Sequence, residues 1–102
     1  MTDCAGWIVR SAAGRDKGTL LCVVGVEEQE PHRLLVADGK RRRSAAPKAK
    51  KRGHVDIVCP GTFRHPVIRK LQDGIPVSDR ELRRALAAFR DQGGNDTWQK
   101  VI

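Results

Sequence analysis

The residues best suited to chemistry in this sequence are the cationic side chains of one short segment. Eight lysines and arginines and no acid stand in residues 40–54: Lys40, Arg41, Arg42, Arg43, Lys48, Lys50, Lys51 and Arg52. Of the chain's 20 lysines and arginines, the other 12 equal its 12 acids in number, so the net charge of +8 arises in this segment. Cations at this density repel one another unless an anion lies against them.

The phosphate backbone of a nucleic acid is the commonest anion of that kind. Arginine pairs with phosphate through two N–H groups, and lysine adds a compact charge. We expect these eight side chains and His54, which ends the segment, to contact nucleic acid. An anionic membrane fits less well, because no apolar helix face accompanies the charge. Charge alone does not distinguish DNA from RNA as the partner. The two basic clusters, residues 40–43 and 48–52, would also serve as a nuclear import signal.

A second candidate is the turn Gly14-Arg15-Asp16-Lys17-Gly18, which lies between two apolar runs. Its glycines allow positive φ and a tight reversal, and they let backbone N–H groups approach a phosphate. Arg15 and Lys17 would then be presented at the tip of the turn as further contacts. Asp16 should repel phosphate, so we expect it to hold the turn through its own backbone, or to pair with Arg15 or a neighbouring strand. Turn formation alone is the alternative role.

Catalytic and metal sites are not indicated. The three histidines, His32, His54 and His65, have no nucleophile or paired carboxylate at motif spacing, and no phosphate-binding loop or dinucleotide fingerprint is present. The three cysteines do not form a C-x-x-C pair, so a structural zinc site is not suggested. We therefore expect a protein that is not an enzyme and that uses no metal or cofactor.

The cysteine pattern and the hydropathy also bear on the compartment. An odd number of widely spaced cysteines suggests free thiols and a reducing environment. No apolar run approaches the ~20 residues of a membrane span, and the first residues do not resemble a secretory leader. A cytoplasmic protein is expected.

Short strands must position the basic residues. Apolar runs predict strands over about residues 5–10, 19–27, 33–37 and 54–58. Asp38-Gly39 is typical of a two-residue type I′ hairpin turn, which would lead into a basic strand over 40–44. Five short strands with glycine-rich turns predict a mainly-β fold, a small barrel, over residues 1–59.

Residues 60–102 are expected to form a helical C-terminal extension. A short helix is predicted over 66–71, and the Ser78–Glu81 pattern is a capping box that should begin a second helix. That helix would place Leu82, Ala85, Leu86 and Phe89 on one face and end at Gly93-Gly94. Its arginines are expected to be solvated while the helix docks on the barrel, or to contact RNA or a protein.

Residues 6–18 (GWIVRSAAGRDKG) resemble the KOW motif of ribosomal and transcription-elongation proteins. With LLVADGKRRR further along, the span from Gly6 to about His54 resembles the bacterial KOW-domain RNA-binding proteins, which are similar to a class of eukaryotic-type large-subunit ribosomal proteins. The resemblance implies an SH3-like barrel that binds structured ribosomal RNA as a ribosome-associated factor in translation.

The same resemblance implies that Arg15 and Lys17 lie on the family's exposed turn and that Gly14 and Gly18 are its turn-forming glycines. One departure is that Thr19-Leu20-Leu21 follows, where ribosomal members often continue with basic residues and another glycine. This shifts the expected RNA contact toward residues 40–52. The alternative function is a protein-interaction adaptor that uses the barrel, with the basic segment only a non-specific charge.

Overall fold

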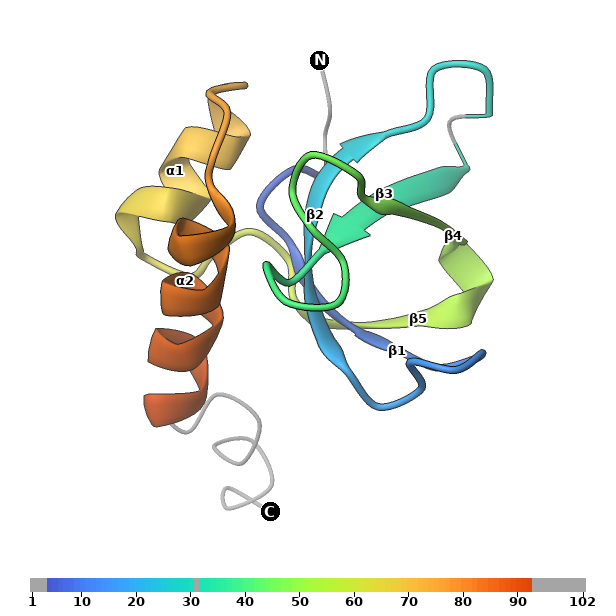
Figure 1. Ribbon diagram of the computed structural model, residues 1–102, viewed down its shortest axis with the longest axis horizontal. Helices are drawn as coiled ribbons and strands as arrows, with labels where there is room; N and C mark the ends of the chain where they lie inside the picture. The colour runs from blue at the N-terminus through green and yellow to red at the C-terminus, as the bar shows by residue number, and fades with distance from the viewer. Residues whose placement is uncertain (1–3, 31, 93–102) are drawn as a thin grey trace.

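Five antiparallel strands form one sheet, and two helices lie against one of its faces (Figure 1). The computed structural model describes residues 4–30 and 32–92. The elements in chain order are β1 (Ile8–Ser11), β2 (Leu20–Val26), β3 (Arg33–Ala37), β4 (Lys48–Lys51), the 3₁₀ turn η1 (Arg52–His54), β5 (Val55–Cys59), α1 (Pro66–Gln72) and α2 (Asp79–Asp91).

The strands are ordered β4-β3-β2-β1-β5, and every neighbouring pair is antiparallel. The edge strands β4 and β5 follow one another in the chain and are joined only by η1. β2, the central strand, is apolar on both faces, because Leu21 and Val23 belong to one core cluster while Leu20 and Cys22 belong to another. Side chains alternate between the faces of a strand, so a continuous apolar run predicts burial from both sides.

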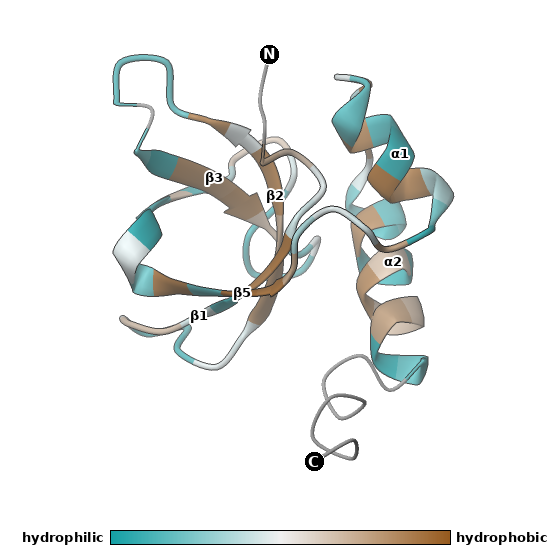
Figure 2. Cartoon of the chain, turned by 180° about the vertical axis from the view of Figure 1, so that it is seen from behind, coloured by the Kyte–Doolittle hydropathy of each residue, from teal (hydrophilic) through white to brown (hydrophobic). Residues whose placement is uncertain are grey.

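The inner cluster lies within the curve of the sheet and is built almost wholly from strand residues: Cys4, Val9, Leu21, Val23, Leu34, Val36 and Val55. The outer cluster joins the opposite sheet face to both helices. It contains Ile8, Leu20, Cys22 and Ala37 of the sheet, with Val67, Ile68, Leu71, Leu82, Ala85, Leu86 and Phe89 of the helices. Figure 2 shows the apolar sides of α1 and α2 turned toward the sheet.

The helices therefore cover a sheet face that would otherwise expose apolar side chains to water. A helical tail appended to a finished barrel is not supported, because α1 and α2 share the outer core with β1, β2 and β3. The two helices are also joined to each other, since Lys70 Nζ donates to Glu81 Oε2 at 2.6 Å. That hydrogen bond lowers the pKa of the partly exposed Glu81 carboxyl.

The helix predictions are confirmed in their local detail. Ser78 accepts from the backbone N–H of Glu81, and the Glu81 carboxylate accepts from the backbone N–H of Ser78, which completes the capping box. The four apolar residues expected on one face of α2 are all buried. The helix ends at Asp91, and the expected stop at Gly93-Gly94 lies outside the described residues. Within the part of the chain that the structure describes, neither helix is long and apolar enough to cross a membrane.

Three strand predictions hold to within a few residues for β1, β2 and β5, and β3 has the predicted bounds. The strand expected over 40–44 is wrong: residues 38–47 form a loop, and the strand that follows is β4 at Lys48–Lys51. Asp38 cannot complete a type I′ turn, because its φ is negative, as it is for every described residue except glycine. Its carboxylate instead accepts the backbone N–H groups of Lys40 and Arg42, which closes a wider turn.

Cys22 is fully buried between the sheet and the helices, as expected for a small apolar side chain. Burial, helped by the nearby Asp38 charge, raises the pKa of its thiol to about 12. The three cysteines are free thiols.

Candidate nucleic-acid interface

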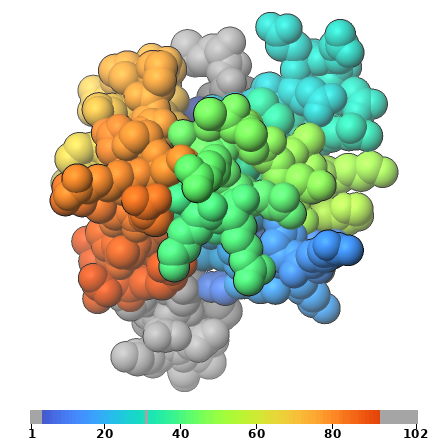
Figure 3. Space-filling view, viewed as in Figure 1, coloured from blue at the N-terminus to red at the C-terminus, as the bar shows by residue number. Residues whose placement is uncertain are grey.

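The structure brings the two predicted contact segments, 14–18 and 40–54, to one face of the molecule. We call this surface, made by residues 14–18 and 38–54, the basic face. Figure 3 shows it directly, with the 38–48 loop in the centre and β4, η1 and the glycine turn beside it. Two hydrogen bonds tie the residues just before the glycine turn to the second segment: Lys50 Nζ donates to the carbonyl of Ala13 at 2.9 Å, and Ala12 N donates to the carbonyl of His54 at 2.8 Å.

The glycine turn has the predicted backbone. Gly14 has φ +85° and Gly18 has φ +90°, in the region that favours glycine. Backbone bonds close the turn, because Gly18 N donates to Ser11 O at 2.7 Å and Thr19 N donates to Asp16 O at 2.9 Å. Arg15 and Lys17 are both exposed on it. The turn therefore holds two cations at a rigid, solvent-facing tip.

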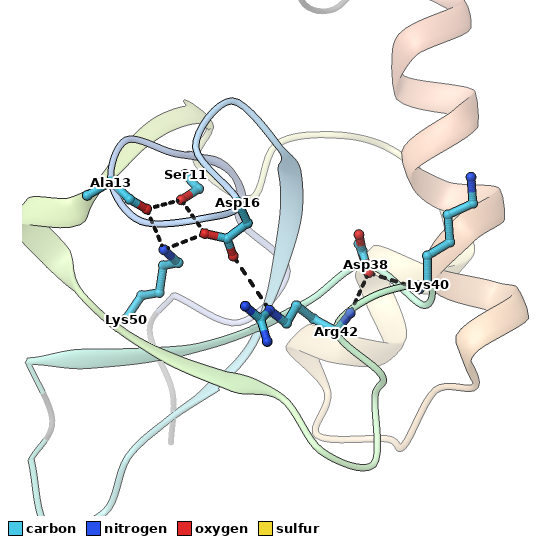
Figure 4. Close-up of polar contacts among 7 residues, drawn as sticks. All are labelled: Ser11, Ala13, Asp16, Asp38, Lys40, Arg42 and Lys50. Carbon is cyan, nitrogen blue, oxygen red and sulfur yellow. Dashed lines mark hydrogen bonds and ion pairs between the residues drawn. The ribbon is translucent and has the colours of Figure 1, made fainter.

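Asp16 explains why an acid sits in this turn. Its side chain is only 5 % exposed, and Lys50 Nζ lies 2.8 Å from its Oδ1. The Ser11 hydroxyl also donates to Oδ1, at 3.0 Å (Figure 4). Arg42 Nε faces Oδ2 at 3.6 Å, close enough for an ion pair and too far for a hydrogen bond. Asp16 thus pairs with a residue of β4, a strand that is not adjacent to β1 or β2 in the sheet, and joins the turn to β4 and to the 38–47 loop.

The same contacts set the ionisation of Asp16. Burial by itself raises the pKa of this carboxyl, but the hydrogen bonds from Lys50 and Ser11 and the charge of Lys50 outweigh it. The net result is a pKa below the ordinary value of 3.8. At neutral pH the side chain is a carboxylate held inside a cationic cluster.

Two of the residues predicted to contact nucleic acid, Lys50 and Arg42, instead pair with Asp16. Lys50 is 8 % exposed, with its ammonium group directed into the turn, and Arg42 is partly buried over Asp16. The single charge of Asp16 offsets one of these two charges, and only Arg42 keeps part of its side chain exposed. The remaining predicted contacts are exposed side chains: Arg15, Lys17, Lys40, Arg41, Arg43, Lys48, Lys51, Arg52 and His54.

The second acid of the basic face is also taken up inside it. Asp38 is 8 % exposed, and its Oδ1 accepts from Lys40 N at 2.9 Å and from Arg42 N at 3.0 Å. Asp38 N and Gly39 N both donate to the carbonyl of Arg42. Lys40 and Arg41 are held at the tip of the compact turn that results. Neither Asp16 nor Asp38, the only acids in segments 14–18 and 38–54, faces the solvent.

Helix α2 anchors the loop from its other side. Arg83 Nη1 donates to the carbonyl of Gly39 at 2.7 Å, and Ser44 N donates to Asp79 Oδ1 at 2.7 Å. Arg43 Nη1 lies 3.7 Å from Asp79 Oδ2. Both anchors come from the first turns of α2, so the helix that completes the outer core also positions the basic loop.

Gly39 packs directly against the start of α2, and its replacement tests this contact between loop and helix. It has φ +79°, and a Cβ there would collide with the carbonyl oxygen of Asp79. Gly39→Ala should destabilise the protein by about 2–3 kcal/mol, because a left-handed alanine costs about 1–2 kcal/mol and the collision adds to it. Urea unfolding measures the loss.

Gly74→Ala is the matched control, since Gly74 has φ +75° and open space around its Cβ position. It should show only the conformational cost of about 1 kcal/mol. Equal losses in the two variants would mean that the loop does not press against α2.

Asp79 and Arg83 are the site residues that the sequence did not single out. The capping box places Asp79 in the first turn of a helix, but its contact with Ser44 spans 35 residues and the Arg83–Gly39 contact spans 44. No local pattern reports such a contact. Among the described residues no group of three or more histidine, cysteine or acidic side chains is arranged to hold a metal ion.

Comparison with models of known protein families finds no match for this chain, and comparison with curated proteins finds none either.

Proposed function

We propose that this protein binds structured RNA through the basic face, as a ribosome-associated factor that docks on ribosomal RNA in the cytoplasm. The observation that carries the proposal is the separation of charge: both acids of segments 14–18 and 38–54 are buried, while eight lysines and arginines there are exposed. A solvated loop kept only for solubility has no need to be anchored, whereas this one is fixed to Asp16 and to α2.

The KOW resemblance supports the same proposal, and with it a closed SH3-like barrel. The two edge strands, β4 and β5, are consecutive in the chain and are separated by the three residues of η1. A connection this short keeps the ends of the two edges near each other, as closure of a five-stranded sheet requires. The φ values of Gly14 and Gly18 agree with their role as the turn-forming glycines of the motif.

The protein would recognise RNA through its phosphate backbone and its folded shape. Arginine and lysine side chains on the basic face pair with phosphates. His54 is the one aromatic ring in segments 14–18 and 38–54, so stacking of several unpaired bases has little support. Trp7 is partly buried against the inner core. A folded RNA with a fixed arrangement of phosphates fits this surface better than a single strand read base by base.

The dependence of affinity on salt tests the proposal. If about five exposed cations contact phosphates, the logarithm of the association constant should fall with that of salt concentration with a slope near −4. Affinity for a fluorescein-labelled RNA stem-loop with an internal loop should then drop by roughly 10²–10³ between 50 and 200 mM salt, measured by fluorescence anisotropy.

Two outcomes speak against the proposed function. Absence of binding at low salt contradicts it outright. Equal affinity for a DNA duplex of matched length would assign the basic face to nucleic acid in general and remove the ribosomal role. A protein-interaction adaptor, the alternative expected from the sequence, predicts the first outcome.

A further inference from the structure

A pocket of about 220 Å³ lies between the loop at the centre of the basic face and helix α2. Its lining is Asp38, Lys40, Arg83, Leu86, Ala87 and Arg90, three cations against one carboxylate. At about 30 Å³ of liquid volume per water molecule, the pocket has room for a phosphate group and several waters. It is separate from the exposed cations of β4 and η1.

One cation of this pocket, Arg83, is held in place, and two exposed cations, Lys40 and Arg90, stand beside it. Arg83 is fixed by its hydrogen bond to the Gly39 carbonyl, which leaves its other N–H groups available. Lys40 extends from the loop toward α2 (Figure 4). Arg83, Ala87 and Arg90 follow one another at helical spacing on the same side of α2. The small side chain of Ala87 keeps the space between the two arginines open.

The one acid in the lining is already engaged. Asp38 Oδ1 accepts two backbone N–H groups from its own loop. Its charge is therefore partly offset by the loop, and the pocket keeps an excess of positive charge. A side chain held in place loses little entropy when it binds an anion, so the fixed Arg83 would bind a phosphate more tightly than a free arginine.

We propose that this pocket binds a phosphate of the RNA backbone, so that the RNA interface continues from the sheet onto α2. The proposal rests on the proposed function and adds a site to it. It divides the arginines of α2 into two groups: Arg83 and Arg90 contact RNA, while Arg80 and Arg84, which do not line the pocket, remain solvated.

The test compares two double variants of equal charge. Lys40→Gln with Arg90→Gln removes two exposed cations of the pocket, and Arg80→Gln with Arg84→Gln removes two exposed cations outside it. Binding of the same labelled stem-loop is measured over a salt series. One phosphate contact contributes about 0.7–0.9 to the slope, so the pocket variant should lose about one unit of slope and roughly 5–10-fold in affinity at 0.1 M salt. The control should keep the wild-type slope.

The possible failures are distinct. If the two double variants lose equal amounts of affinity and of salt-dependence slope, the arginines of α2 attract RNA only through net charge. That result overturns phosphate binding in the pocket and leaves the proposed function standing. If the wild-type protein does not bind the stem-loop at low salt, both proposals are overturned. Urea unfolding of both variants shows that they are folded, as expected for substitutions of exposed side chains.

Discussion

Replacing Lys48, Lys51 and Arg52 by glutamine should lower RNA affinity by about 10²-fold at 0.1 M salt. Each phosphate contact contributes about 0.8 logarithmic units to the association constant at that concentration, because the contact releases counterions from the RNA. These side chains are exposed and come from an ordered strand and the 3₁₀ turn after it. Fluorescence anisotropy with the labelled stem-loop measures the loss.

The matched control removes three exposed arginines elsewhere, with Arg64→Gln, Arg80→Gln and Arg84→Gln. The net charge falls by the same amount, so a general attraction between a basic protein and an acidic polymer would weaken equally in both triple variants. We expect the control to lose less than about 10-fold. Similar losses of affinity in the two variants would mean that RNA is attracted by net charge and is not bound at the basic face.

The second large effect concerns stability. Asp16→Ala should cost about 3 kcal/mol, since removal of one partner from a buried ion pair leaves the other charge without compensation. Lys50 would keep its ammonium group almost fully buried with only the Ala13 carbonyl beside it. With a urea dependence of about 1.5 kcal/mol per molar, the midpoint of unfolding should fall by about 2 M.

A double variant distinguishes the loss of the Asp16–Lys50 ion pair from damage to the glycine turn. Asp16→Ala combined with Lys50→Met removes both charges and keeps an apolar side chain at position 50, so much of the lost stability should return. If the double variant is no more stable than Asp16→Ala alone, the cost lies in the turn and not in an unpaired Lys50 charge.

The pH dependence follows from the lowered pKa of Asp16. A carboxyl whose pKa is lower in the folded protein stabilises it fully above the unfolded value, near 3.8, and loses that effect as pH falls through the folded value. The difference in stability between the wild type and Asp16→Asn should therefore be constant near neutral pH and shrink below about pH 3.8. A difference that stays constant to lower pH would contradict the ionised pair.

Much of the fold was accessible from the sequence because its signals are local. Apolar runs mark β1, β2, β3 and β5, and the Ser78–Glu81 capping box marks the start of α2. The apolar face of α2 was also visible from its spacing. The covering role of the helices follows from β2, whose residues are apolar on both faces and so need a second layer.

The predictions that were wrong concern residues whose structure depends on contacts between distant parts of the chain. Lys50 stands in the most basic part of the sequence, which favours an exposed side chain, yet it is buried because it pairs with Asp16 of the glycine turn. The strand expected over 40–44 is a loop because the Asp38 carboxylate binds two backbone N–H groups, and α2 then fixes that loop. Composition describes the charge of a segment but not which charges are already paired.

The measurement that tests the central claim most directly is crosslinking in cells followed by sequencing of the attached RNA. The wild type is compared with the Lys48, Lys51 and Arg52 triple variant and with the Arg64, Arg80 and Arg84 control. We predict crosslinks concentrated at one site of ribosomal RNA, lost in the triple variant and retained in the control. Crosslinks that are absent, scattered over many RNAs, or equally abundant in the triple variant would contradict docking on ribosomal RNA through the basic face.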